Sequence, residues 1–370
     1  MLRQALAPPG DETTSRRRIG HLARHPGPAV ATYADTGPYQ QCMKAVVHSE
    51  YGGPEVLHLA EVEKPEPAPR EILVKVHAAA LNPVDWHFVR GKPFPLRMAA
   101  GGLRRPRRAR RVGGDFAGTV EACGPGVTRF AVGEPVFGLA DGSLAEYLTM
   151  RADGAVAPVP RRITLEQAAA VPLAGLTALQ VLRDKVRLQP GQAILIVGAG
   201  GGIGTFAVQL AKSYGAHVTG VQSTSALDLV RSLGADRVID YTREDFTAGE
   251  PRYDAVVDNV SNRRLNDVLR VVKRGGTLVP NGGGSPEQGI SMRGLLHLLA
   301  IRPFITQKIR LFVTKPNHAD LQVLAGLLEA GTLAPVIDRC YPMTAAVEAF
   351  RHLESGHAHG KIVVSIAPGA

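Results

Sequence analysis

The segment Val197-Gly198-Ala199-Gly200-Gly201-Gly202-Ile203-Gly204 decides the fold of this chain. It follows the run Ile194–Val197, which is apolar throughout, as a central strand of a parallel sheet must be. It opens a helical segment at 203–214, and this strand, turn and helix give the context that a dinucleotide-binding fingerprint requires. Small residues at Ala199, Gly201 and Gly204 suit a tight turn, close approach of the backbone to a pyrophosphate, and close helix–strand packing. The helix N-terminus adds unpaired N–H groups for the phosphates.

The order of strand and helix patterns in the remaining sequence predicts an α/β protein made of a β-rich unit and a Rossmann unit with a doubly wound parallel sheet. Short strands separated by turns are expected at 43–48, 56–62, 71–80, 115–123 and 144–150. After residue 165 helices and strands alternate, as in βαβ units. We therefore expect the following division of the chain: a disordered N-terminal extension, 1–42; the first part of a β-rich catalytic domain, 43–165; a Rossmann nucleotide-binding domain, 166–304; and a return segment that completes the catalytic domain, 305–370.

Composition argues against several classes of function. The net charge of +10 is concentrated, because 104–111 holds six arginines and no acid, and 1–42 holds five arginines against three acids. Nucleic-acid binding is not expected, since aromatic residues make up only 5% of the chain. No apolar run has the roughly 18 residues that a membrane span needs. The three cysteines lack the spacing of a disulfide framework or a zinc lobe, so we expect a cytoplasmic protein.

The strand after the glycine turn bears on the choice of cofactor. Sites that prefer NADH usually carry Asp or Glu about 20 residues after the turn, where the carboxylate accepts hydrogen bonds from the ribose 2′-OH. No acid occurs between 205 and 227, and Ser223 and Thr224 stand at this place. Hydroxyl groups can donate to a 2′-phosphate, so the sequence favours NADPH over NADH. No Lys or Arg directly follows Ser223, and Arg231, Arg237 or Tyr241 would have to supply further contacts through space.

Several short motifs, taken together, resemble one known family. They are Met43-Lys44-Ala45, Asn82-Pro83-Val84-Asp85, Gly114-Asp115-Phe116-Ala117-Gly118, Ala169-Ala170-Val171-Pro172, the glycine turn and Gly360-Lys361. Their order and spacing over 43–370 resemble the medium-chain dehydrogenase/reductase superfamily, and within it the zinc-independent quinone oxidoreductase and zeta-crystallin branch. The resemblance implies a GroES-like catalytic domain, NADPH between it and the Rossmann domain, and a homodimer. Zinc-dependent relatives carry Cys in place of Asn82 and Gly-His-Glu in place of Gly113-Gly114-Asp115, so no zinc or other metal is expected.

The resemblance also assigns residues to the site. Asn82, Asp85 and Thr177 are the catalytic candidates, with Asn82 beside the nicotinamide and Thr177 at its ribose or carboxamide. A turn role for Asn82 before Pro83 and a sheet-edge role for Tyr241 stay open. The cofactor-binding candidates are Ala199, Gly201, Gly202, Ile203, Gly204, Ser223, Thr224, Tyr241, Asn259, Asn281, Gly282 and Lys361.

Without a metal, positioning and electrostatics must carry the reaction. We expect hydride transfer from NADPH to a quinone or an enone, with the Asn82 amide or a backbone N–H stabilising the charge that develops on the acceptor oxygen. Two alternatives stay open: a zinc-free alcohol dehydrogenase or carbonyl reductase, and an NADPH-binding structural or regulatory protein without turnover. The arginine-rich segment 104–111 is either a solvated loop or an attractant for an anionic substrate.

Overall fold

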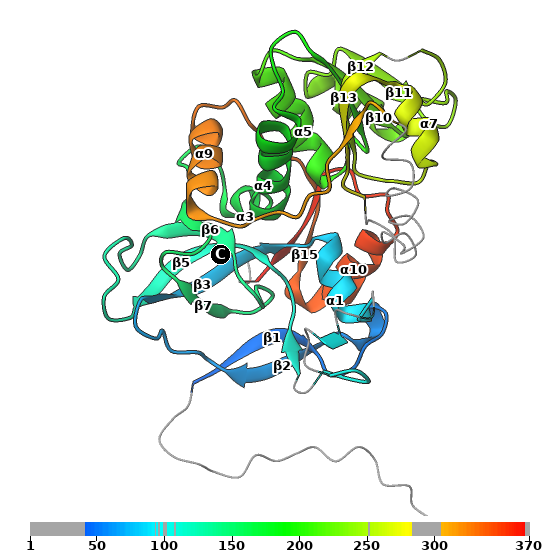
Figure 1. Ribbon diagram of the computed structural model, residues 1–370. Helices are drawn as coiled ribbons and strands as arrows, with labels where there is room; N and C mark the ends of the chain where they lie inside the picture. Colours follow the sequence, from blue (N-terminus) through cyan, green and yellow to red (C-terminus); the bar gives the residue numbers. More distant parts are fainter. Residues whose placement is uncertain are drawn as a thin grey trace, which may run out of the picture. The chain divides into compact units, whose positions relative to one another are not determined.

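The computed structural model describes residues 41–92, 94, 97–98, 102–106, 109–250, 252–282 and 305–366. The extension expected at 1–42 lies almost wholly outside these residues. The strands of the described residues, from Gln41 onward, form three sheets (Figure 1).

The Rossmann sheet has the strand order β11-β10-β9-β12-β13-β14, and all of its pairings are parallel. Its strands are β9 (Ala193–Val197), β10 (His217–Gln222), β11 (Arg237–Asp240), β12 (Tyr253–Asp258), β13 (Val272–Pro280) and β14 (Lys308–Ile309). Its helices are α5 (Gly202–Ser213), η3 (Thr224–Ala226), α6 (Leu227–Ser232) and α7 (Leu265–Arg270). Because β14 pairs with β13, the boundary expected at residue 304 lies inside this sheet.

The β-rich part contains a seven-stranded sheet of order β15-β16-β3-β5-β6-β8, with β7 paired to β3, and a three-stranded sheet of order β2-β1-β4. The strands are β1 (Cys42–His48), β2 (His58–Glu63), β3 (Glu71–Ala80), β4 (Arg110–Arg111), β5 (Asp115–Cys123), β6 (Pro135–Leu139), β7 (Tyr147–Arg151), β8 (Val156–Pro158), β15 (Ile337–Pro342) and β16 (Lys361–Ser365). The helices here are η1 (Pro54–Val56), α1 (Pro83–Arg90), η5 (Met343–Ala345) and α10 (Ala346–Glu354). Strand β16 pairs antiparallel with β3, so the end of the chain completes this sheet, as the sequence predicts.

Three helices join the two parts: α3 (Leu165–Ala169), α4 (Pro172–Gln180) and α9 (His318–Glu329). Thr164 caps α3, since its hydroxyl accepts from the N–H of Gln167 and Gln167 Oε1 accepts from the N–H of Thr164. Helix α4 has Pro172 in its first turn and continues as a π-helical turn, η2 (Val181–Val186).

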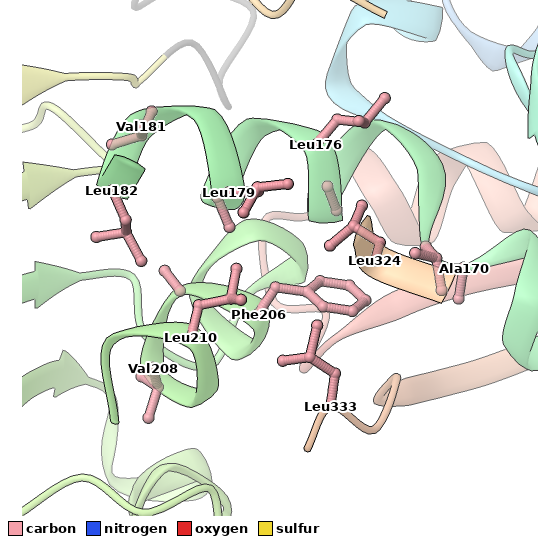
Figure 2. Packing of buried hydrophobic residues seen from close by; sticks show 14 of the residues in the cluster. Ala170, Leu176, Leu179, Val181, Leu182, Phe206, Val208, Leu210, Leu324 and Leu333 are labelled. Atoms are coloured by element: carbon pink, nitrogen blue, oxygen red, sulfur yellow. The ribbon is translucent and has the colours of Figure 1, made fainter. Parts of the chain in front are cut away.

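The largest apolar core lies between α4, α5 and α9 (Figure 2). Leu179 of α4 lies on the side of Phe206 and Leu210 of α5, Leu176 belongs to the same cluster, and Leu324 reaches it from α9. All five side chains are buried. This core fixes α4 against the helix that follows the glycine turn, and it therefore sets the position of Thr177 relative to that turn.

Candidate active site

A cavity of about 820 Å³ brings the glycine turn together with residues of the β-rich part. Gly198, Gly201, Gly202, Ile203 and Gly204 line it from the Rossmann part. The β-rich part and α4 contribute the other walls, and the predicted site residues among them are Asn82, Asp85, Thr177 and Lys361. The cavity also includes Asn259 and Asn281, which follow the neighbouring strands β12 and β13. Residues predicted from separate motifs thus share one cavity.

The glycine turn has the geometry of a phosphate cradle. Gly198 has φ +73°, the left-handed region that favours glycine. A Cβ on Gly204 would lie 2.1 Å from the carbonyl oxygen of Gly198, so only glycine lets α5 cross this turn. Gly201 is the N-cap of α5 and provides no side-chain cap for the first helical N–H groups. These donors, at the positive end of the helix dipole, fit the pyrophosphate of a dinucleotide.

A buried polar cluster stands on the β-rich side of the cavity. The Lys361 ammonium donates to the Leu81 carbonyl at 3.0 Å, to Asn82 Oδ1 at 2.5 Å and to Asp115 Oδ2 at 3.1 Å. Asn82 Nδ2 donates to the same Asp115 oxygen at 2.9 Å. The other Asp115 oxygen accepts from the N–H of Leu173 in the first turn of α4. The side chains of Lys361 and Asp115 are only 3% and 0% exposed, so this ion pair is shielded from water.

This cluster fixes the orientation of the Asn82 amide. Lysine has no acceptor, so the amide oxygen must face Lys361 and the NH₂ group must face Asp115. One N–H of Asn82 is then used by Asp115, and the other has only a long contact of 3.5 Å with the Ala80 carbonyl. The second N–H can therefore serve as a donor to a bound molecule in the cavity.

Asp85 lies one turn into α1, beside the cluster. One of its oxygens accepts from the Asn82 N–H at 2.7 Å, which makes it part of the helix cap. Burial raises the pKa of Asp85 to about 7, and the nearby Asp115 carboxylate adds to the rise. The group therefore exchanges its proton near neutral pH.

Further polar contacts position the remaining residues of the cavity. Thr177 donates to the Leu173 carbonyl or shares a hydrogen bond of 2.6 Å with Thr314, which lies after β14. Asn259 donates to the Val197 carbonyl at 3.1 Å, and Asn281 donates to Asn259 Oδ1 at 3.0 Å. The two asparagines are thus held at the carboxyl ends of adjacent strands, where ligands of open α/β sheets bind.

The polar and charged contacts at the end of β10 differ from those that the sequence suggested. Thr224 donates to Asp240 Oδ2 at 2.5 Å, and this bond lowers the pKa of Asp240. An acid at the end of the neighbouring strand β11 thus lies beside Thr224, although none occurs in 205–227 itself. Arg231 and Arg237, the two expected sources of positive charge, are paired with Asp228 and Glu244.

Another basic group comes close instead. His359 Nε2 lies 3.3 Å from the hydroxyl of Ser225, which in turn lies 3.1 Å from that of Ser223. His359 directly precedes Gly360, whose N–H donates to the Gly200 carbonyl at 2.8 Å. The return segment therefore contacts both the glycine turn and the serine pair after β10.

The predicted site residues fall into two sets. Most of them line the cavity, but Ala199 is fully buried beneath the turn, Gly282 packs on Ser261, and Ser223, Thr224 and Tyr241 lie outside the cavity lining. Sequence reasoning missed Asp115 and His359. Asp115 stands in a quoted motif and His359 precedes another, but nothing in either motif shows which distant partner the side chain reaches.

No group of three or more His, Cys, Asp or Glu side chains that could hold a metal ion occurs among the described residues. No helix in the part of the chain that the structure describes is long and apolar enough to cross a membrane.

Comparison with known proteins matches two family models. Residues 68–161 match the alcohol dehydrogenase GroES-like domain, and residues 233–364 match a family described as zinc-binding dehydrogenase. The NADPH-dependent alkenal/one oxidoreductase of Arabidopsis thaliana chloroplasts is 33% identical over 96% of this chain and 88% of its own. A quinone oxidoreductase of Pseudomonas aeruginosa is 34% identical over 87% of this chain and 99% of its own. The solved quinone oxidoreductase of Coxiella burnetii superposes with a TM-score of 0.76 at 29% identity, over 88% of this chain and all of that one.

Proposed function

Because the chain belongs to the quinone oxidoreductase branch of the medium-chain dehydrogenase/reductase superfamily, we propose that it reduces a quinone or an α,β-unsaturated carbonyl compound with NADPH. The observation that carries the proposal is the oriented amide of Asn82, which shares a cavity with the glycine turn. When bound, NADPH supplies the hydride.

The residues that would hold the cofactor follow from the cavity. The N–H groups of Gly202, Ile203 and Gly204 would bind the pyrophosphate, and Thr177, Asn259 and Asn281 would contact the nicotinamide half. Ser223, His359 and Tyr241 would approach the 2′-phosphate, with Thr224 held by Asp240. The preference for NADPH is supported by these hydroxyl groups and by the NADPH named for the Arabidopsis relative.

On the acceptor side, one residue would stabilise the developing negative charge and another would supply the proton. The second N–H of Asn82 would donate to the acceptor oxygen as negative charge develops there, and Lys361 and Asp115 would hold the amide in place. Asp85, with a pKa of about 7, would supply a proton.

We further propose that activity does not need zinc. Zinc ligands of related enzymes take the positions of these residues. Here both Asn82 Oδ1 and Asp115 Oδ2 already accept a hydrogen bond from the Lys361 ammonium. A buried ammonium at this place opposes a dication electrostatically.

A homodimer is also part of the proposal. Strand β14 lies at the edge of the Rossmann sheet, and the residues after it include Leu311 at 45% and Val313 at 82% exposure. An edge strand with exposed apolar side chains is a surface that a second copy can extend. Val313 also lines the cavity, so sedimentation of the wild type and of Leu311→Glu tests this, and a wild-type monomer would contradict it.

The decisive test of the reaction is NADPH oxidation with a panel of acceptors, with and without a chelator. A quinone, an enone, an enoyl thioester and an aldehyde separate the candidate reactions. Turnover of the quinone or the enone that survives chelation supports the proposal. Turnover of the aldehyde alone would favour a carbonyl reductase, and NADPH binding without any turnover would favour a structural or regulatory protein.

The role of Asn82 has its own test. For Asn82→Ala we expect kcat to fall by about 10²–10³, the usual effect of losing one preorganised donor, with NADPH binding close to normal. Stopped-flow hydride transfer and fluorescence titration with NADPH measure the two quantities. Wild-type turnover in this variant would remove Asn82 from the mechanism.

A further inference from the structure

Arg110 brings a positive charge into the acceptor side of the cavity. Four residues that line the cavity meet there, and we call them the arginine wall: His48, Phe88, Arg110 and Asp141. The Arg110 guanidinium lies over the Phe88 ring, 5.5 Å from its centroid, and its Nη2 is 3.3 Å from Asp141 Oδ2. Arg110 belongs to the arginine-rich segment 104–111, which the proposed reaction leaves without a role.

Strand pairing separates the side chains of Arg110 and Arg111, although both residues line the cavity. In the antiparallel pair of β1 and β4, His48 lies opposite Arg110 and Val47 lies opposite Arg111. Directly opposed residues share a face of the sheet, and successive residues alternate. Arg110 therefore lies on the same face of the strand pair as His48, whereas the Arg111 guanidinium already donates to the Tyr147 carbonyl at 3.4 Å.

The charges around Arg110 leave it available to an anion. Burial is the main cause that lowers the pKa of His48, the hydrogen bond to Glu50 opposes it, and Arg110 lowers it further, so these surroundings favour the uncharged imidazole. Its Nδ1 donates to the Glu50 carbonyl at 2.9 Å. The acidic partner of Arg110 is Asp141, whose side chain is 83% exposed. An exposed carboxylate on a turn can rotate into solvent and be replaced by another anion, because exposed ion pairs contribute little free energy.

The wall lies close to the reacting groups. Phe88 and Asp85 are three residues apart on α1, so they are neighbours on one face of the helix. Asn82 caps that helix, and the six residues from Asn82 to Phe88 span roughly 9 Å along its axis. An acceptor whose oxygen meets the Asn82 amide would therefore reach Arg110 through a chain of several bonds.

Resting on the proposed function, we propose that the natural acceptor is an unsaturated carbonyl compound with a carboxylate at the end of such a chain, and that Arg110 binds this carboxylate in place of Asp141. The guanidinium fork pairs with carboxylates through two parallel hydrogen bonds. The contact with Asp141 demonstrates that a carboxylate oxygen reaches this guanidinium.

The experiment uses vinyl ketones that end in a carboxylate after saturated chains of increasing length, each paired with its primary amide. The measured quantity is the ratio of kcat/KM for the carboxylate to kcat/KM for the amide. In the wild type we expect a ratio of about ten or more at one chain length, the usual strength of a charge-assisted hydrogen bond. Turnover of the amides reports separately on the proposed function, because it needs the hydride and Asn82 but no anion.

Variants assign the effect to Arg110. In Arg110→Met, which keeps an apolar stem on Phe88, the ratio should fall to about one, and in Asp141→Asn it should rise because the competing carboxylate is gone. Arg105→Met, an exposed arginine of the same segment outside the cavity lining, is the matched control and should keep the wild-type ratio. A wild-type ratio near one at every chain length, or an unchanged ratio in Arg110→Met, would overturn the proposal even if the amides are reduced.

Discussion

The two ends of the cavity, the proposed nucleotide end and the proposed acceptor end, are built from different groups. The nucleotide end is defined by the turn 198–204 with Asn259 and Asn281, and main-chain N–H groups and small residues form the turn there. At the acceptor end, defined by Asn82, Asp85, Asp115 and Lys361, buried ionisable side chains hold one amide in place. The nucleotide end needs shape and the helix dipole, whereas the acceptor end needs charges in balance.

The difference affects how each end responds to change. A backbone cradle is insensitive to pH and fails when a side chain fills its space. A buried ionic cluster tolerates no unpaired member, since a lone charge out of water is costly. Variants at the two ends should therefore differ in kind as well as in size.

The largest effect is expected from Lys361→Met, which strips Asp115 of its buried partner. The free energy of unfolding should fall by about 3–5 kcal/mol, because an uncompensated charge remains in the interior. Lys273→Met is the matched control, since Lys273 pairs with Asp254 at 2.9 Å but is 45% exposed. That exposed pair should contribute no more than about 1 kcal/mol.

Urea denaturation measures both variants. A double variant, Lys361→Met with Asp115→Asn, should recover part of the loss because the unpaired charge is removed. If Lys361→Met costs no more than Lys273→Met, the acceptor end does not depend on balanced charges, and the contrast between the two ends is lost.

The nucleotide end could be predicted from sequence because its determinants are adjacent. Strand, turn and helix occupy one continuous stretch, and every requirement is for a small residue or an apolar run. The family resemblance supplied the acceptor residue Asn82, and the fold class was confirmed. The domain boundary expected at residue 304 was not found there, because β14 pairs with β13 and extends the Rossmann sheet beyond it.

The partners at the acceptor end could not be predicted in the same way. Lys361 and Asn82 are 279 residues apart, and no local pattern states that one ammonium will meet the amide and Asp115 together. The same holds for Asp240 at Thr224 and for His359 at Ser225, where adjacent strands and the return segment bring the groups together. Such contacts depend on sheet order, which periodicity alone does not fix.

Asp85→Asn tests whether the acceptor end carries the pH dependence of the protein. The folded protein holds the Asp85 proton up to a pKa of about 7, whereas an ordinary Asp releases it near 3.8. The favourable contribution of Asp85 is therefore complete below pH 3.8 and is lost as the pH rises to 7, because the unfolded chain binds fewer protons. The loss should amount to roughly 2–4 kcal/mol.

The measurement is the free energy of unfolding of the wild type minus that of Asp85→Asn, at a series of pH values. The subtraction cancels groups that both proteins share, such as Asp258, whose pKa is also raised by burial. The difference should decline steadily with rising pH. A difference that stays constant would show that Asp85 is ionised throughout and cannot act as the proton donor.

Gly204→Ala tests the nucleotide end by filling space without adding charge. The new Cβ would meet the Gly198 carbonyl oxygen at 2.1 Å, so the turn or α5 must move. We expect a loss of about 1–3 kcal/mol in stability, as for other overpacked sites, and weaker NADPH binding, both independent of pH.

Gly326→Ala provides the matched control in α9. Its Cβ would meet nothing within 4 Å, and a helical glycine is less stable than alanine by roughly 0.5–1 kcal/mol. The same substitution should therefore destabilise at 204 and stabilise at 326, with calorimetric titration reporting on NADPH. Unchanged NADPH binding in Gly204→Ala would mean that the turn is not the phosphate cradle.

The smallest effect is expected at His359, where the two ends meet, because this residue of the return segment touches Ser225 next to the nucleotide end. In His359→Ala the Kd for NADPH should rise about three- to tenfold, the usual effect of losing one partly exposed hydrogen bond, while the Kd for NADH stays the same. His357→Ala is the control, since His357 is exposed and lies outside the cavity lining. An equal rise for both nucleotides would place His359 at the pyrophosphate instead. An unchanged Kd for both nucleotides would leave the serine hydroxyls as the partners of the 2′-phosphate. The nucleotide end would then be built from the backbone, and the acceptor end from side chains, more strictly than the contact with Ser225 suggests.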